Sequence, residues 1–413
     1  MSSRTSRLPS AYWRQFAAST VSNLGDGANA AAMPLLAARL TDDVRLIASV
    51  SFVSMLPWLV LSLPAGVLID RWRRTSVMIA AEWTRAVMYL SLAALVATDL
   101  LRIWTLLVFL LVIGCAEVFY DMTAQAFLPA IVPADRLERA NGLLYSAEIV
   151  CNGFIGLPLG TWLFVIASAV PFGINGASFA LAAVLVAGIA RRLPDDRAAH
   201  ADDGRRRFMT ELADGMRWLL AHRNLRTLAI LLGVTNAAMM FGESILVKFA
   251  FRELGLDERG FGILLALSSA GAIVGGLLGH RIAGRLGITA SLVTAYAVFA
   301  VADTVRAGWP GIVVFTVMSV AVSLAGTVWN VVTVSYRQRH IPADLFGRVN
   351  SAYRFIGTGS VAVGALVGGQ VAHSFGLRAP FFLGSAVTVM ALVWGLPVLT
   401  DGSFSAEPVS SQD

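Results

Sequence analysis

The sequence predicts an all-α integral membrane protein, with twelve transmembrane helices in two six-helix bundles related by pseudo-symmetry. Composition, recurring apolar segments and an internal repeat predict this fold class. Hydrophobic residues make up 57% of the 413 residues and charged residues 14%, whereas about a quarter of residues are charged in soluble proteins. The composition therefore excludes an ordinary soluble domain.

Apolar segments recur along nearly the whole chain. Each is long enough to cross a hydrocarbon core, which takes about 20 residues, and examples are 47–69, 77–98 and 381–397. The first segment, 13–40, follows several arginines, as a secretory signal would. It contains Asp26, lacks a small-residue cleavage site and is too long for a signal, so we expect a retained helix.

The chain contains an internal repeat. VPAD at 132–135 recurs as IPAD at 341–344, and GVLIDR at 66–71 aligns with GLLGHR at 276–281. Both matches lie at the same separation, roughly 210 residues, which indicates duplication of a six-helix unit. Two such units, with substrate handled between them near mid-membrane, are typical of one large class of transporters.

The only long polar stretch separates the two repeats. We predict an N-terminal bundle at 1–190, a cytoplasmic linker at 191–226, a C-terminal bundle at 227–400 and a disordered tail at 401–413. Within the linker, helical spacing predicts an amphipathic helix on the cytoplasmic face. Its apolar side is made of Phe208, Leu212, Met216, Leu219 and Leu220.

The positions of the basic residues predict the orientation. With the N-terminus inside, most of the 32 Lys and Arg residues fall on the cytoplasmic side, as the positive-inside rule requires. We therefore expect a multi-pass protein of the inner (plasma) membrane with both termini in the cytoplasm. The net charge of +6 reflects this orientation, and no nucleic-acid partner is expected.

The sequence shows no enzymatic constellation. Cys115 and Cys151 lie inside predicted helices and are interpreted as small core residues. No nucleotide-binding loop, metal cluster or nucleophile arrangement is evident. We expect no catalytic residues, no metal, no cofactor and no direct use of ATP.

Three segments carry a resemblance to a known family. GVLIDRWRR at 66–74 resembles the loop signature of the major facilitator superfamily, although Trp72 stands where that loop usually has glycine. LGDG at 24–27 and the stretch 117–141 are similar to the macrolide-efflux and enterobactin-exporter branch. The resemblance covers 13–397, and the exporter-associated glycine pattern of helix five is present only as GLPLG at 156–160.

The resemblance implies a conformational latch that stabilises the outward-facing state. Its first copy consists of Gly66, Asp70, Arg71, Arg73 and Arg74; the alternative is that these charges only set the topology. Further latch candidates are Glu82 and Arg85, which are three apart and can pair on one helix face, Arg281 in the second repeat, where His280 replaces Asp70, and Arg354 early in helix eleven.

Ionisable groups inside the membrane are costly, by roughly 2.5 to 3.5 kcal/mol each on insertion scales, so each is a functional candidate. Asp26 lies near the middle of helix one, and Glu117 and Asp121 share one face of helix four. The resemblance implies that these helices line the central cavity. We predict proton or substrate handling; the alternatives are structural hydrogen bonding for Asp26 and the latch network for the other two.

The second half offers cavity candidates of a different kind. Asn236 is the repeat equivalent of Asp26 and cannot titrate, so proton coupling is expected to be asymmetric. Glu243 and Lys248 approach the periplasmic end, where a snorkelling pair or gate is an alternative to substrate binding. Trp329 and Asn330 are further candidates. Small residues that allow close helix packing are Gly156, Pro158, Gly160, Gly275 and Gly279.

Together these features predict a proton-coupled exporter of a small hydrophobic or amphipathic compound, such as a drug, an antibiotic or a siderophore-like molecule, working by alternating access. The expected partners are the substrate, protons and the lipid bilayer, and the protein is expected to be a monomer. One alternative is a proton-linked importer or uniporter of a small nutrient. Another is a non-transporting membrane sensor or scaffold.

Overall fold

Helices account for the regular structure throughout the described part of the chain. The computed structural model describes residues 8–133, 136–190, 204–402 and 404. Side chains inside helices are not described at 62–71, 125–126, 129–130, 138–139, 149, 154, 189–190, 204–209, 211–212, 343–344 and 347. The predicted latch residues Gly66, Asp70 and Arg71 belong to this set. Residues 191–203 of the predicted linker and 405–413 of the predicted tail also lie outside the described residues.

Ten helices of the described chain are long and apolar enough to cross a membrane, which confirms the all-α membrane fold class. One of the ten, α11 (Glu258–Gly308), has 51 residues, roughly 75 Å if straight, more than twice a hydrocarbon core. Gly287 divides it, with a φ of 77° that glycine adopts without steric cost. The 31-residue α1 (Ser10–Leu40) is not among the ten, and the count of twelve spans remains a prediction.

The chain separates into two compact units, Met1–Leu40 with Leu56–Arg207, and Thr41–Met55 with Phe208–Asp413. The main division, between Arg207 and Phe208, falls inside the predicted linker, and the predicted domain boundaries remain predictions. One difference is that Thr41–Met55, the start of α2 (Val44–Arg71), groups with the second unit. Gly369 of α13 (Ala343–Phe375) packs closely against this part of α2: a methyl group on Gly369 would lie 2.5 Å from the Cβ of Ala48.

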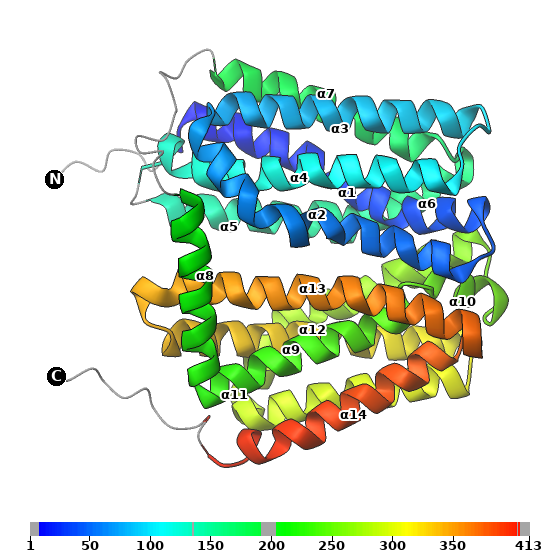
Figure 1. Ribbon diagram of the computed structural model, residues 1–413. Helices are drawn as coiled ribbons and strands as arrows, with labels where there is room; N and C mark the ends of the chain where they lie inside the picture. Colours follow the sequence, from blue (N-terminus) through cyan, green and yellow to red (C-terminus); the bar gives the residue numbers. More distant parts are fainter. Residues whose placement is uncertain (1–7, 134–135, 191–203, 403, 405–413) are drawn as a thin grey trace, which may run out of the picture. The chain divides into compact units, whose positions relative to one another are not determined.

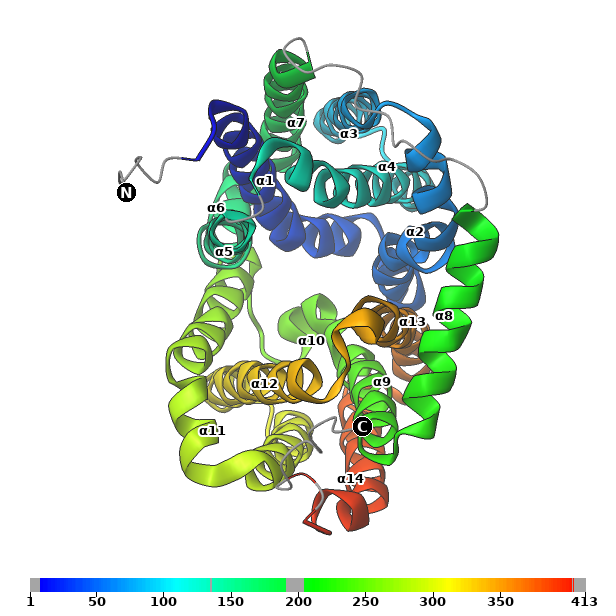
Figure 2. The ribbon, with the colours of Figure 1, turned by 90° about the vertical axis from the view of Figure 1, so that its left-hand side faces the viewer.

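The first unit is built around α1. Its neighbours along the chain are α3 (Arg74–Ala97), α4 (Ile103–Ile131), α5 (Leu137–Glu148), α6 (Leu157–Ile166) and α7 (Val170–Ala190). Helix α3 packs against α4 and α7, and α1 against α6 and α7, as the end-on view shows (Figure 2). The buried core of this unit includes Tyr12, Met78, Phe127 and Val186, which come from α1, α3, α4 and α7.

A π-helical segment, η2 (Ile149–Gly156), joins α5 to α6. Such segments are uncommon and often occur at functional sites. A methyl group on Gly156 would come within 2.6 Å of the Cα of Gly27, and one on Gly160 would come closer still to the carbonyl oxygen of Ala28. These small residues and Pro158, in the first turn of α6, belong to the stretch predicted to serve helix packing, and they bring α6 and η2 close to α1.

The second unit contains α9 (Arg223–Glu243), α10 (Leu246–Arg252), α11, α12 (Ile312–His340), α13 and α14 (Ala379–Leu399). Helix α9 packs against α13 and α14, and α11 against α12 and α14. A methyl group on Gly275 of α11 would lie 2.8 Å from Thr327 Cβ, whereas at Gly279 the nearest atom is 3.5 Å away. Gly275 therefore requires the absence of a side chain, and Gly279 has ordinary contact distance.

The amphipathic helix predicted in the linker corresponds to α8 (Gly204–Ala221). It crosses the beginnings of α9 and α13 instead of running along the bundle (Figure 1). Leu219 is completely buried and Met216 and Trp218 pack against the core of the second unit. Gly215 allows close contact, because a methyl group there would lie 2.6 Å from the carbonyl oxygen of Arg348.

Candidate functional site

Two glycines hold the backbone around Asp26 in a tight space in the first unit. A methyl group on Gly25 would lie 2.8 Å from Ser178 Oγ on α7, and one on Gly27 would lie 2.7 Å from the Cα of Asn152 on η2. Helix α1 is therefore held against two neighbours at the residues on either side of Asp26. This packing gives a physical reason for the sequence LGDG at 24–27.

Arg85 on α3 meets the carboxylate of Asp26. Its Nη2 donates to both oxygens of Asp26, at 3.0 and 2.9 Å. The side chain of Arg85 is 2% exposed and that of Asp26 is 27% exposed. Charge-assisted hydrogen bonds of this kind are stronger than neutral ones, above all where water is excluded. Arg85, predicted as a latch residue, therefore lies with the predicted proton-handling residue.

The partner that helical spacing predicts for Arg85 is further away. Glu82 is fully buried, and its Oε2 lies 3.9 Å from Arg85 Nη1, beyond hydrogen-bonding distance. The guanidinium lies 3.7 Å over the ring of Phe179, a cation–π contact that further fixes its position. One buried cation is thus shared between a close and a more distant carboxylate.

Polar groups extend this cluster on both sides. Asn29, one turn beyond Asp26 on α1, donates from Nδ2 to Tyr89 Oη at 2.7 Å. Glu117 of α4 is partly buried, with a hydrogen bond from Trp58 and electrostatic contact with Arg85. Asp121 is also partly buried. We refer to Asp26, Glu82, Arg85 and Glu117 as the buried acidic cluster.

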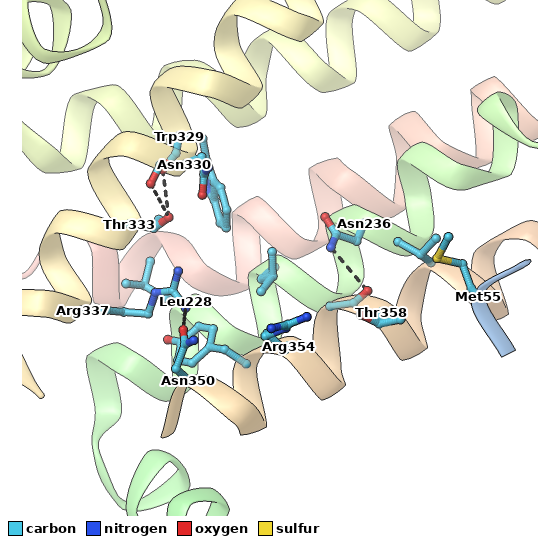
Figure 3. A pocket seen from close by; sticks show the side chains of 14 residues that line it. Met55, Leu228, Asn236, Trp329, Asn330, Thr333, Arg337, Asn350, Arg354 and Thr358 are labelled. Atoms are coloured by element: carbon cyan, nitrogen blue, oxygen red, sulfur yellow. Dashed lines mark hydrogen bonds between the residues drawn. The ribbon is translucent and has the colours of Figure 1, made fainter. Parts of the chain in front are cut away.

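The second unit contains a cavity of about 350 Å³ (Figure 3). Predicted site residues from three helices line it: Asn236 of α9, Trp329 and Asn330 of α12, and Arg354 of α13. Asn236 Nδ2 donates to the carbonyl oxygen of Gly357 at 3.5 Å. The indole of Trp329 is held by a hydrogen bond from Nε1 to Tyr296 Oη at 3.0 Å. Arg354, predicted as a latch residue, is thus a cavity residue.

Among the lining residues of this cavity that sequence reasoning missed, three form a linked polar group. Arg337, Asn350 and Tyr353 line it together. Arg337 Nη1 donates to Asn350 Oδ1 at 3.2 Å, and its guanidinium lies 4.5 Å from the ring centre of Tyr353. Arg337 stands near the basic end of α12, next to Arg339 and His340. Its sequence context therefore suggested only a topology signal.

A second buried ion-pair cluster lies elsewhere in the second unit. Arg306 is 4% exposed, and its Nη1 lies 3.5 Å from Glu243 Oε1 and 3.3 Å from Asp303 Oδ1. Its Nη2 donates to Ser319 Oγ at 2.8 Å. Asp303 was not identified as a candidate, although an acid and an arginine three apart in an apolar segment are a recognisable signal.

Lys248 pairs with the loop that precedes α2. Its Nζ donates to Asp42 Oδ1 at 2.6 Å, and Arg252 Nη2 lies 3.1 Å from the same atom. Lys248 is 6% exposed and Asp42 is 82% exposed. The pairing of Glu243 with Arg306 and of Lys248 with Asp42 places these two candidates in separate contacts.

The remaining predicted latch residues lie at the surface or partly buried. Arg73 and Arg281 are exposed, and Arg74 is partly buried. Arg73 and Arg74 of the first latch copy, and Arg281 of its repeat, are thus not part of the buried acidic cluster. With Gly66, Asp70 and Arg71 outside the described side chains, the latch itself remains a prediction.

Comparison with known proteins places these features in a family context. The family described as "Transmembrane secretion effector" matches residues 8–403. The chain is 25% identical to an uncharacterised MFS-type transporter, YfiS, of Bacillus subtilis, covering 91% of this chain and 89% of that one. It is 23% identical to macrolide efflux protein A of Streptococcus pyogenes, covering 86% and 87%. It is 26% identical to the multidrug efflux pump Tap of Mycolicibacterium fortuitum, covering 95% and 97%.

Solved structures are similar in fold. A bacterial homologue of the iron transporter ferroportin, in an inward-facing state, matches with a TM-score of 0.73 at 15% identity, covering 94% of this chain and 98% of that one. At this identity the likeness concerns the fold alone.

Proposed function

The chain belongs to the transmembrane secretion effector family of major facilitator transporters, and from this premise we propose that it exports a small amphipathic compound in exchange for protons. It is a multi-pass membrane protein and a transporter, not an enzyme. The observation that carries the proposal is the ion pair between Asp26 and Arg85, at 2.9 Å, inside the first unit.

This ion pair supports coupling because its strength depends on the protonation of one residue. Ionised Asp26 attracts the guanidinium of Arg85, whereas protonated Asp26 offers no negative charge. A buried arginine without its counter-charge is unfavourable, by several kcal/mol in general. Protonation of Asp26 therefore makes the guanidinium available to Glu82 and Glu117, and proton binding becomes linked to a rearrangement of α1 against α3.

The proposed cycle uses this linkage for alternating access. A proton from outside binds Asp26, or Glu117 beside it, while substrate leaves to the outside; release of the proton to the cytoplasm restores the ion pair. Inward proton flow thereby drives outward substrate flow. Asn236 occupies the repeat-equivalent position in the second unit and cannot titrate, so the proton pathway runs through the first unit alone.

The relatives support export as the direction of transport. Macrolide efflux protein A and the Tap pump are named as exporters, and we extend that direction to this chain. The corresponding location is the bacterial plasma membrane, with both termini in the cytoplasm and the transporter acting as a monomer. Protease protection of terminal tags in right-side-out vesicles tests the orientation.

Substrate-stimulated proton movement in proteoliposomes tests the function. The intact protein and Asp26→Asn are reconstituted with an internal pH dye and supplied with macrolides, cationic dyes and siderophores. We expect at least one compound to move protons through the intact protein and not through the variant. Asp214→Asn is the matched control, because Asp214 lies on α8 and, among the described residues, pairs with exposed Arg217, at 3.4 Å.

The outcomes separate the alternatives. Compound flux that ignores both the pH gradient and the Asp26 substitution would identify a uniporter and refute proton coupling. Absence of flux for every compound, with both proteins correctly folded, would favour a sensor or scaffold.

A further inference from the structure

We propose that the cavity of the second unit binds the anionic group of the transported compound, so that the substrate is an amphipathic organic anion carrying a carboxylate, sulfonate or phosphate. This inference rests on the proposed transport function and names its substrate class. It concerns the 350 Å³ cavity between α9, α12 and α13 (Figure 3).

The charges that line the cavity are positive. Arg337 and Arg354 contribute guanidinium groups, and none of the described lining residues carries a carboxylate. Asn236, Asn330 and Asn350 contribute amides that can donate hydrogen bonds without adding charge. An anion in this cavity would meet two guanidinium groups and several hydrogen-bond donors, whereas a cation would be repelled by both arginines.

Arg337 retains unused donor capacity toward an anion. Among the described residues, it donates one hydrogen bond to Asn350 and stacks on Tyr353, and both partners are uncharged. Its buried Nε has no hydrogen-bond partner in the described part of the chain. Arg337 is partly buried, and no carboxylate among the described residues of the cavity balances its charge, which favours the approach of another anion. In contrast, Arg306 and Arg85 of the buried clusters each have acidic partners.

The side chain of Arg337 is held in place without a ligand. Tyr353, on which the guanidinium stacks, donates from Oη to the carbonyl oxygen of Leu225 at 2.6 Å. Asn350 accepts from Arg337 at 3.2 Å. This preorganisation reduces the entropy cost of binding, and the planar fork of an arginine suits carboxylate and phosphate groups.

The rest of the cavity wall is apolar. Met55, Leu228, Leu232 and Val361 line it, together with the indole of Trp329. The hydrogen bond to Tyr296 sets the orientation of the Trp329 indole, so this ring is a fixed surface for an aromatic or aliphatic group of the ligand. An amphipathic anion matches this division of charge and apolar surface, and an inorganic anion would use only part of it.

Binding of three matched probes tests the proposal. Naphthalene-2-acetate, its neutral amide and 2-naphthylethylammonium share one ring system and differ in charge. Their affinities are measured by calorimetry at pH 7.5, with the full-length protein in phosphatidylcholine nanodiscs and empty nanodiscs as the blank. We expect the acetate to bind at least roughly tenfold more tightly than the amide, because hydrogen bonds to a charged group are stronger than those to a neutral one. We expect the ammonium to bind most weakly.

Variants assign the preference to Arg337. Arg337→Gln should remove the preference for the acetate and leave amide binding unchanged, which also shows that the cavity is intact. Arg337→Lys, which keeps the charge, should retain part of the preference. The matched control is Arg339→Gln, because Arg339 is exposed on the same helix and donates to the carbonyl oxygen of Ser335; it should behave as the intact protein.

Several results would overturn the inference. These are equal affinity for the three probes, tighter binding of the ammonium, or an acetate preference that survives Arg337→Gln. Adding phosphatidylglycerol distinguishes a lipid headgroup: loss of acetate binding would make the occupant a lipid and refute a soluble substrate. Because no proton gradient is involved, anion selectivity can fail while proton-coupled efflux persists, and efflux can fail while the selectivity holds.

Discussion

Arg85 on α3 lies closer to Asp26, 59 positions away in the chain, than to Glu82 on its own helix. The shortest distance is 2.9 Å to Asp26 and 3.9 Å to Glu82. A contact between α1 and α3 therefore dominates over the local pair that helical spacing offers. The carboxylate of Asp26 on α1 is thereby tied to a buried cation on a second helix.

The ion pair predicts a graded response to substitution of Asp26. Asp26→Leu should destabilise the protein by about 3–5 kcal/mol, because it leaves the buried guanidinium of Arg85 without its nearest counter-charge. Asp26→Asn should cost less, because its amide oxygen still accepts a hydrogen bond from Arg85. Thermal unfolding in detergent, followed by tryptophan fluorescence, ranks the variants. Equal melting temperatures for the two variants would contradict the role of this contact.

The sequence is informative where a property depends on local spacing. Apolar spacing and the repeat predict helices, bundle class and the position of α8, and the composition predicts the membrane environment. LGDG at 24–27 identifies Asp26 as a candidate, and the structure adds the reason for its glycines. Asn236, Trp329 and Asn330 are likewise identified from their helices, and they line one cavity.

Long-range partners could not be predicted from one sequence. The pairing of Asp26 with Arg85, of Lys248 with Asp42 and of Arg306 with Glu243 joins residues from different helices or loops. Helical spacing says which residues share a face, but it does not say which helices are neighbours. The grouping of Thr41–Met55 with the second unit depends on the same missing information.

Gly27 should tolerate no side chain. Gly27→Ala places a methyl group 2.7 Å from the Cα of Asn152, and overpacking of this kind costs about 1–3 kcal/mol. The control is Gly142→Ala on α5, where nothing lies within 4 Å of the added methyl group. That substitution should be neutral or slightly stabilising, since alanine favours helix more than glycine. Thermal unfolding separates the two, and a similar effect from both would refute the close approach of α1 and η2.

The Asp42–Lys248 contact should be independent of pH near neutrality. The hydrogen bond from Lys248 and its charge hold the pKa of Asp42 below the ordinary value of 3.8. A carboxyl group whose pKa is lowered on folding stabilises the folded state above its unfolded pKa, and this is lost as the pH falls through the folded value. Asp42→Asn should therefore lower the melting temperature equally at pH 7.5 and pH 5.5.

The melting temperature should fall in Asp42→Asn because the ammonium group of Lys248 is buried. Lys248 is 6% exposed, so removing the acid leaves a cation that is poorly solvated. Asp42→Asn combined with Lys248→Met removes both charges and should restore most of the lost melting temperature. A decrease that halves between pH 7.5 and pH 5.5, or a double variant less stable than Asp42→Asn, would contradict this account. Asp43, whose pKa is lowered to about 2 chiefly by a hydrogen bond from Arg45, provides a neighbouring control that shares the same pH insensitivity.

The buried cluster around Arg306 should serve stability and not coupling. Arg306→Met leaves Asp303, 10% exposed, without its cation, and should cost about 3–5 kcal/mol. The double variant with Asp303→Asn should recover most of this loss, because Glu243 is 37% exposed and water can solvate it. Thermal unfolding measures both. In proteoliposomes, Asp303→Asn should retain substrate-driven proton movement, whereas Asp26→Asn loses it. Loss of proton movement in a stable Asp303→Asn protein would place a titrating carboxylate in the second unit as well, and the asymmetric pathway inferred from Asn236 would be wrong.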